Sequence, residues 1–500
     1  MASLPAHGSW NQPHLVRLNS LTILLIFFAS ANGYDSSLMN SLQALPQWNS
    51  FMSNPQGTWL GFINAIYFFG ILSAYPFSPV ISQRFGRKCG NYVGYLFLVA
   101  GTIVQTSAQN QASFLVARYL TGVSCGFWTT TAPLLISEIS YPAHRAILST
   151  LFMCGYYLGA VMSAWATFGT RSLESSWSWR IPSILQLVCP TISCISLIFC
   201  PQSPRWLIHV GRNEEARQMI AKHHAGGAID DPLVVEEMEL METALQLETE
   251  ASQTTWVRDM VSTAGNRHRL LISISLAVFT QWCGSGVVSY YLTMILNTVG
   301  VTSTTDQLII SGSLQIWNFL LAFVSACVVE RIGRRGLFQL SAGIMLVSFA
   351  VITGLTAGFE KSQNTPVGVA VVPFLFLFFG GYDIALTPLI TAYPCEIWPF
   401  TLRARGLTLT WTVNVAANCF NVFVSPIAMD AISWKYYLVF IVMLCVYNIT
   451  VYFFYVETRG CTLEGIALIF DGESDDGPVI VGKDPNSADH VSSLEKGVST

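Results

Sequence analysis

The chain has 500 residues, of which 52% are hydrophobic and only 11% are charged. Soluble globular domains carry roughly 25% charged residues, so this composition excludes an ordinary soluble protein. The net charge of −4, without a cluster of basic residues, leaves nothing for a nucleic-acid backbone to bind. The 12 cysteines stand singly and mostly inside apolar stretches, so we expect neither a metal site nor a disulfide framework.

The apolar residues are gathered in stretches long enough to cross a bilayer. Polar or turn-rich breaks divide these stretches into twelve predicted helices, which makes the expected fold an all-α membrane protein. We expect the spans at 18–41, 58–82, 90–108, 112–137, 147–168, 180–200, 269–297, 307–329, 336–357, 366–394, 406–429 and 434–456.

The basic residues predict which ends of the spans face the cytoplasm. With both termini inside, only Arg171, Arg180, Lys361 and Lys435 of the 25 Lys and Arg would face outward, as the positive-inside rule favours. The plasma membrane is the expected location, because no retention or organelle signal is recognised. The predicted parts are a cytoplasmic N-terminus (1–17), a six-helix half (18–200), a cytoplasmic loop (201–268), a second six-helix half (269–456) and an acidic cytoplasmic tail (457–500).

Two segments of the central loop, Asn213 to His224 and Val234 to Glu248, have helical apolar spacing with charged opposite faces. We expect them to form short interfacial helices under the bundle. His223 and His224 are predicted to lie in a solvated turn rather than to bind a metal.

An internal repeat relates the two halves at an offset of about 250 residues. The string Arg84-Phe85-Gly86-Arg87-Lys88 matches 331–335, and Glu138-Ile139 matches Glu396-Ile397. Two parallel six-span halves are the plan of transporters that bind their substrate between the halves near mid-membrane.

The repeated charges lie at predicted cytoplasmic ends of helices, where the two glutamates can pair with neighbouring arginines. Such pairs would close the inner side and latch an outward-open state. The alternative is that each arginine is only a positive-inside anchor. The predicted cytoplasmic gate consists of Arg84, Arg87, Glu138, Arg145, Glu330, Arg334, Glu396 and Arg403.

Several motifs follow one another in a fixed order along the chain. They are Arg-x-Gly-Arg-Lys at 84–88, the segment 133–145, Pro-x-Ser-Pro-Arg-Trp-Leu at 201–207, Glu-Ile-Trp-Pro with Leu-Arg-Ala at 396–404, and Glu-Thr-Arg-Gly at 457–460. Together they resemble the sugar porters of the major facilitator superfamily, over roughly 32–466. The segments 281–284, 289–291, 382–388 and 432–437 resemble its fungal lactose-permease-like branch. This resemblance implies the two-half fold of that superfamily and transport of a sugar with a proton.

Charged residues within the predicted spans need a partner or a role, since each costs about 2.5 to 3.5 kcal/mol at the bilayer centre. Asp35 lies in the first span and Arg118 in the fourth. A carboxylate that faces a guanidinium until protonation breaks the pair is the minimal device for proton coupling. The alternative is a purely structural salt bridge. In the resemblance, Asp35 matches the acid that proton symporters keep, and Arg118 matches its partner.

The repeat does not demand these charges, because the position that corresponds to Arg118 in the second half is Phe376. A third charge, Asp383 in the tenth span, has no evident partner in the sequence. We expect it either to cap an unwinding of the helix near Gly380-Gly381 and Pro388 or to face the cavity.

The resemblance also implies a set of substrate-binding residues. A neutral polyol needs amide and hydroxyl groups to hydrogen-bond its own hydroxyls. Gln281, Asn318 and Asn414 match family positions that contact sugar, and Asn418 lies one turn beyond Asn414. Tyr290 and Tyr291 match positions near the outer gate. The alternative for the three amides is hydrogen bonding between helices.

Four recognition positions differ from the family pattern, with smaller or less polar residues. Thr280 replaces the first of two glutamines, Gly286 an asparagine, Met153 an amide and Thr391 a tryptophan. We keep Thr391 among the binding candidates. A cavity altered in this way favours a solute that is larger or less hydrophilic than a simple hexose, such as a glycoside or a pathway metabolite.

The expected function is secondary active transport, with import of a sugar or glycoside coupled to a proton by alternating access. The expected partners are therefore the solute, the proton and the lipid bilayer. One alternative is a facilitator or exporter of a small metabolite on the same fold, and a second is a nutrient sensor that does not transport. No enzyme is expected, because no nucleophile and base can be placed together. No cofactor is expected either, and no phosphate-binding loop supports direct drive by ATP.

Overall fold

The computed structural model describes residues 12–252, 256–459, 466 and 469–471, and these residues form helices and no strand. The first half contains α1 (Pro13–Leu25), α2 (Phe27–Leu42), α3 (Pro46–Phe51), α4 (Gly57–Ala74), α5 (Phe77–Phe85), α6 (Arg87–Thr106), α7 (Gln111–Ile139), α8 (Pro142–Thr170), α9 (Trp177–Leu185) and α10 (Val188–Phe199). The loop contains α11 (Pro204–His209), α12 (Asn213–His224), α13 (Pro232–Ser252) and α14 (Trp256–Ser262). The second half contains α15 (Ala264–Trp282), α16 (Ser285–Thr298), α17 (Thr304–Ile332), α18 (Arg334–Ser362), α19 (Thr365–Val369), α20 (Val371–Ile397), α21 (Phe400–Ile432), a short 3₁₀ turn (Ser433–Lys435) and α22 (Tyr436–Phe454).

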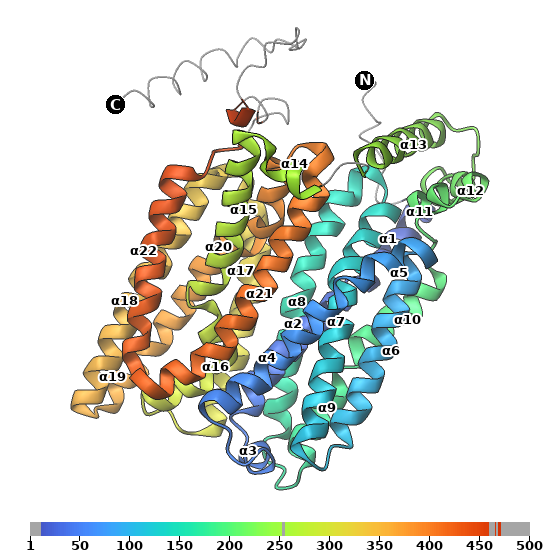
Figure 1. Ribbon diagram of the computed structural model, residues 1–500. Helices are drawn as coiled ribbons and strands as arrows, with labels where there is room; N and C mark the ends of the chain where they lie inside the picture. Colours follow the sequence, from blue (N-terminus) through green and yellow to red (C-terminus); the bar gives the residue numbers. More distant parts are fainter. Residues whose placement is uncertain (1–11, 253–255, 460–465, 467–468, 472–500) are drawn as a thin grey trace, which may run out of the picture.

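The long helices form two bundles that stand side by side (Figure 1). Along their contact, α4 packs against α21 and α8 packs against α17. The helices α11 to α14 lie at one end of the bundles, at the top of the view (Figure 1). We call this the α11–α14 end and the other the opposite end.

Twelve membrane-spanning segments account for the long helices. Within the described residues, nine stretches are long and apolar enough to cross a membrane, and one of them, Arg405–Phe454, contains both α21 and α22. The remaining two spans are α6 and α7, which are less apolar because they carry charged side chains such as Arg87, Arg118 and Glu138. Helices suit this environment because every backbone amide finds its partner within the same segment. The predicted twelve-helix, two-half fold is confirmed.

Helix starts in the bundles are fixed by side chains that accept from free backbone amides. Asn110 accepts from the amide of Ser113 at 2.8 Å at the start of α7, and Thr263 accepts from Asn266 at 3.0 Å at the start of α15. These polar capping residues interrupt the apolar stretches, so the starts of the helices can be recognised in the sequence.

Several predicted spans are interrupted, and one predicted interruption is absent. The seventh span breaks between α15 and α16 at Gly284, whose φ is +103°, and a Cβ there would lie 2.5 Å from the Phe349 ring. The unwinding predicted near Gly380 and Pro388 is wrong, because α20 continues through both residues. Neighbouring helices stabilise a proline within a membrane helix, so Pro388 alone does not end α20.

The loop helices α12 and α13 cover the two segments with helical spacing, whereas α11 and α14 were not anticipated. The solvated turn predicted at His224 is wrong. Its imidazole is buried, with Nδ1 3.0 Å from Glu237 Oε2 and Nε2 3.2 Å from the carbonyl oxygen of Ile139. These contacts attach α12 and α13 to the end of α7. No cluster of three potential metal ligands occurs in the described part of the chain.

Candidate functional site

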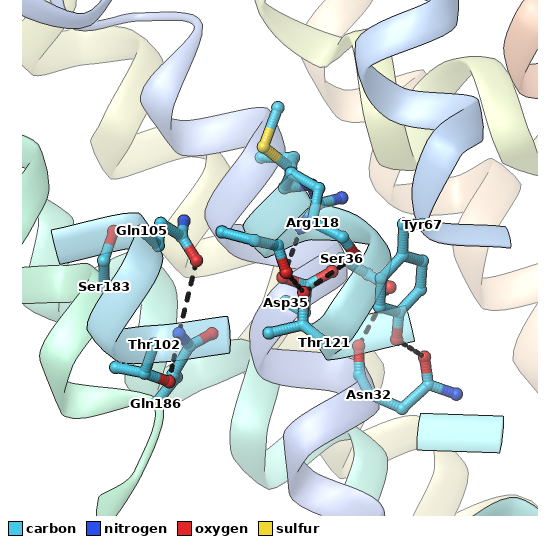
Figure 2. A network of polar contacts seen from close by, with 12 residues as sticks. Asn32, Asp35, Ser36, Tyr67, Thr102, Gln105, Arg118, Thr121, Ser183 and Gln186 are labelled. Atoms are coloured by element: carbon cyan, nitrogen blue, oxygen red, sulfur yellow. Dashed lines mark hydrogen bonds and ion pairs between the residues drawn. The ribbon is translucent and has the colours of Figure 1, made fainter. Parts of the chain in front are cut away.

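Asp35 of α2 and Arg118 of α7 form a buried ion pair, and each residue is 2% exposed. Figure 2 shows the two side chains facing each other, with Arg118 Nη1 donating to Asp35 Oδ1. The guanidinium carbon of Arg118 also lies over the Tyr67 ring, 4.9 Å from the ring centroid. Asp35 Oδ2 and Arg118 Nε have no hydrogen-bond partner among the described residues. The pair is therefore joined by one bond rather than two.

Amide side chains of α15 and α21 lie together at mid-span. Gln281 Nε2 donates to Asn414 Oδ1 at 3.2 Å, and Asn414 Nδ2 donates to the Ala277 carbonyl at 3.2 Å. Asn418 lies one turn beyond Asn414 in α21, and its buried Oδ1 has no hydrogen-bond partner among the described residues. Gln281 and Asn414 are thus brought together, and their bond is also what hydrogen bonding between helices would produce.

Two further predicted residues stand apart from this group. Asn318 of α17 is 2% exposed, and its Oδ1 has no partner within the described structure. The Thr391 hydroxyl of α20 is likewise buried without a partner there. Both carry polar atoms that a bound polar molecule could satisfy.

The two tyrosines of α16 join the halves toward the opposite end. The Tyr290 hydroxyl lies 3.2 Å from that of Ser36, and Gln43 Nε2 donates to the Tyr290 carbonyl at 2.9 Å. The Tyr291 hydroxyl accepts from Asn64 Nδ2 at 3.2 Å. Further bonds across the halves at this end join Asn40 to Ser311 and Thr293 to the Asn40 carbonyl. The opposite end is therefore closed across the halves.

At the α11–α14 end the glutamates pair within their own half. Arg87 Nε donates to Glu138 Oε2 at 3.1 Å, and Arg334 Nη2 donates to Glu396 Oε1 at 2.9 Å. The hydroxyl of Ser203 donates to Glu138, and that of Thr458 donates to Glu396. These ion pairs therefore hold each half together at this end.

The other predicted gate residues have different surroundings. Arg84 is exposed and lies over the ring of Phe85. Arg145 lies within electrostatic range of Glu138 and Glu237. Arg403 Nε donates to the Trp398 carbonyl at 3.4 Å. The side chain of Glu330 lies outside the described residues.

Asp383 of α20 has partners that the sequence did not reveal. Its Oδ1 accepts from the Tyr157 hydroxyl at 2.5 Å and from the Thr387 hydroxyl at 2.8 Å. Tyr157 belongs to α8 in the first half, so this contact crosses between the halves. No sequence pattern points to a tyrosine 226 residues away.

The chain matches the family described as "Sugar (and other) transporter" over residues 21–470. The sugar transporter STL1 of Saccharomyces cerevisiae is 30% identical over 476 residues, which cover 91% of this chain and 82% of that protein. A high-affinity glucose transporter of Kluyveromyces lactis is 26% identical over 472 residues, with 91% and 85% covered. The MFS-type transporter oryC of Aspergillus oryzae is 30% identical over 438 residues, with 86% and 79% covered.

Among solved structures, the xylose transporter XylE from E. coli in a partially occluded inward-open conformation has a TM-score of 0.74. It is 19% identical, and the alignment covers 89% of this chain and 100% of that one. This likeness shows a shared fold, and the family match covers most of the chain. The protein therefore belongs to the sugar transporter family of the major facilitator superfamily, whose members are transporters and not enzymes.

Proposed function

We propose that this transporter imports a sugar or glycoside together with a proton. A site between the two halves would open alternately to the two sides of the membrane. The observation that carries the proposal is the buried contact between Asp35 and Arg118. A charged pair within a membrane is expensive to bury, and removing one partner leaves an uncompensated charge. Binding a proton to Asp35 would therefore remove the charge that compensates the buried Arg118 guanidinium.

The geometry of the pair suits proton binding. One oxygen of Asp35 accepts from Arg118, and the other has no partner in the described structure. A proton would bind this second oxygen. Once Asp35 is neutral, the face of the Tyr67 ring remains as a partner for the Arg118 cation.

Ser36 links the proton site to the contact between the halves. It follows Asp35 directly in α2, and its hydroxyl lies 3.2 Å from that of Tyr290 in the other half. A change of charge at Asp35 would alter this contact and shift the balance between the two states. The distribution of Lys and Arg supports an assignment of the α11–α14 end and both termini to the cytoplasm. The plasma membrane remains the proposed location, because no retention or organelle signal is recognised. In that assignment the closed end faces outward.

The relatives support a sugar as the solute. They include a glucose transporter, and one solved neighbour is described as a proton:xylose symporter. A membrane potential of 100 mV contributes about 2.3 kcal/mol for each proton moved inward, close to fiftyfold accumulation. Proton coupling therefore supplies enough drive without ATP.

A facilitator or exporter of a small metabolite is the second candidate. The replacements at Met153, Thr280, Gly286 and Thr391 favour it, since they remove groups that would bind a hexose. An exporter would use the same fold without linking Asp35 to uptake.

The test is uptake of labelled hexoses, disaccharides and glycosides into transport-deficient cells at acidic and neutral external pH. We expect uptake that is faster at acidic pH and alkalinises the medium. Asp35→Asn should abolish the pH dependence, whereas Asp35→Glu, which keeps the carboxyl group, should retain part of it. Glu174→Gln, at an exposed carboxylate between α8 and α9, is the matched control. Surface expression is measured for each variant, and absence of pH-dependent uptake for every sugar would leave the second candidate.

A further inference from the structure

Asp383 is a buried acid that the proposed proton pathway does not use. It is 0% exposed in the middle of α20, and its Oδ1 accepts from two hydroxyls. Its Oδ2 has no hydrogen-bond partner among the described residues, and no described cation forms an ion pair with it. A buried carboxylate oxygen without a partner is costly, so a further hydrogen-bonding group is expected at this position.

The depth of Asp383 in the bundle matches that of the predicted substrate residues. Asp383, Tyr157, Asn318 and Asn414 all lie near the middle of their long helices, α20, α8, α17 and α21. Asp35 instead lies in α2, the half of the first span Pro13–Leu42 that is nearer the opposite end. Transporters with two repeated halves bind their solutes near mid-membrane, where the halves meet. Asp383 stands at that depth and contacts both halves.

The neighbours of Asp383 and Tyr157 connect them to the other polar groups. The helix of Asp383, α20, packs against α17, which carries Asn318, and against α15, which carries Gln281. The rings of Tyr156 and Tyr157 lie 5.3 Å apart between centroids, and the backbone of Tyr156 lies against Gly33 of α2, two residues before Asp35. The buried acid therefore lies beside the same contact region between the halves.

We propose that Asp383, with the hydroxyls of Tyr157 and Thr387, binds a hydroxyl group of the transported solute. This inference rests on the proposed function and names a further specificity-determining residue for it. The solute hydroxyl donates to Oδ2, while Oδ1 keeps its bonds to Tyr157 and Thr387. A solute bound in this way is held by α20 directly and by α8 through Asp383, so both halves contribute to its recognition.

The chemistry of the surroundings favours a neutral polyol. The three groups at this position are a carboxyl and two hydroxyls. The helices α15 and α21, which carry the bonded amides of Gln281 and Asn414, both pack against α20. Such groups match the donors and acceptors of sugar hydroxyls. The carboxylate also supplies a strong acceptor in a chain that has lost four polar or aromatic recognition groups elsewhere.

The experiment measures binding to the purified full-length protein by intrinsic tryptophan fluorescence. The probes are D-glucose, D-xylose, methyl β-D-glucoside and the monodeoxy analogues of each, with D-glucosamine as a cationic comparison. We expect Asp383→Asn to weaken binding of a neutral sugar about ten- to hundredfold, because a charged hydrogen bond is replaced. Tyr157→Phe should weaken it a few-fold, and Asp383→Glu should restore part of the affinity. Asp306→Asn, at an exposed acid at the start of α17, is the control and should bind as wild type.

The deoxy series separates direct contact from a structural role. In wild type, one monodeoxy analogue should bind more weakly than its parent sugar, and in Asp383→Asn the two should bind alike. Equal weakening of every analogue would overturn the proposal. So would undiminished binding by a folded Asp383→Asn, absence of sugar binding by wild type, or an effect confined to D-glucosamine. Sugar binding that depends on Asp383 without proton-linked uptake would support this inference and count against proton coupling.

Discussion

The two halves of the molecule are alike at the α11–α14 end and unlike at their centres. In each half an arginine at the start of a helix pairs with the glutamate near the end of another, and a hydroxyl donates to that glutamate. The preceding glycines also match, since Gly86 and Gly333 both have φ of +96°. The same backbone and the same bonds therefore recur about 250 residues apart.

The centres of the equivalent helices α7 and α20 carry different charges. Arg118 of α7 corresponds to Phe376 of α20, and the same offset places Cys125 opposite Asp383. A repeat preserves what both halves need in order to fold. Charges that break the repeat within a membrane are costly and are typical of function. The difference shows that the repeated pairs hold the two bundles, and it supports the proposal that the unrepeated Arg118 and Asp383 take part in transport.

The largest expected effect comes from separating the buried pair. Asp35→Asn and Arg118→Gln should each lower the free energy of unfolding by about 3 to 5 kcal/mol, because each leaves a buried group uncompensated. The double variant should lose less than the sum of the two. Thermal unfolding in detergent measures all three proteins.

The exposed pair Arg212 and Glu215 is the control, with side chains 50% and 52% exposed. Its removal should change stability by less than about 0.5 kcal/mol. Strict additivity at Asp35 and Arg118 would show that their contact contributes nothing to stability and would weaken the contrast between the centres.

The second effect tests the repeated backbone. Gly86 and Gly333 have ψ of 158° and 153° with their positive φ, a region open essentially to glycine. A Cβ would lie 2.4 Å from Gln202 Nε2 at Gly86 and 2.8 Å from Glu457 Oε2 at Gly333. Gly86→Ala and Gly333→Ala should therefore each cost about 1 to 3 kcal/mol of unfolding free energy.

Gly343→Ala, within α18, provides the matched control. A Cβ there meets nothing within 4 Å, so this substitution should be neutral or slightly stabilising by helix propensity. If Gly333→Ala changed the free energy of unfolding as little as Gly343→Ala, the positive φ at Gly333 would not contribute to stability.

Features encoded locally could be predicted from the sequence. Hydropathy located the spans, and the short motifs located the repeated Arg87 and Arg334 with their glutamates. The contact between Asp35 and Arg118 could also be anticipated. Few charged residues lie inside the spans, and opposite charges within a membrane are stabilised by pairing. Each of these predictions uses the sequence of one segment, or of two segments that each contain a charged residue rare within a membrane span.

Features that depend on packing could not be predicted. Pro388 leaves α20 intact because surrounding helices hold it. The left-handed backbone of Gly284 ends α15, and the ring of Phe349 leaves no room there for a Cβ. The partner of Asp383 is one tyrosine among 18 in the chain, and nothing local singles out Tyr157. His224 is buried where α12 meets Glu237 of α13 and the carbonyl of Ile139 at the end of α7.

The smallest expected effect is that of Glu396→Gln, and it is best compared with Glu138→Gln, because the two glutamates are alike in bonding and unlike in exposure. The Glu138 side chain is 4% exposed and that of Glu396 is 24% exposed. Both substitutions to glutamine keep the shape and remove the charge. Glu138→Gln should cost about 1.5 to 3 kcal/mol of unfolding free energy, as for a buried charged hydrogen bond. Glu396→Gln should cost about 1 kcal/mol or less, because water screens its pair.

Thermal unfolding of both variants beside wild type measures this difference. The first half also carries the contact of Ser203 with Glu138 and the attachment of His224 to the end of α7. A larger effect at Glu138 would mean that burial strengthens the pair at the place where the loop is attached to the first half. Equal effects would mean that burial does not decide the strength of these pairs, and the two halves would be alike at this end in energy as well as in geometry.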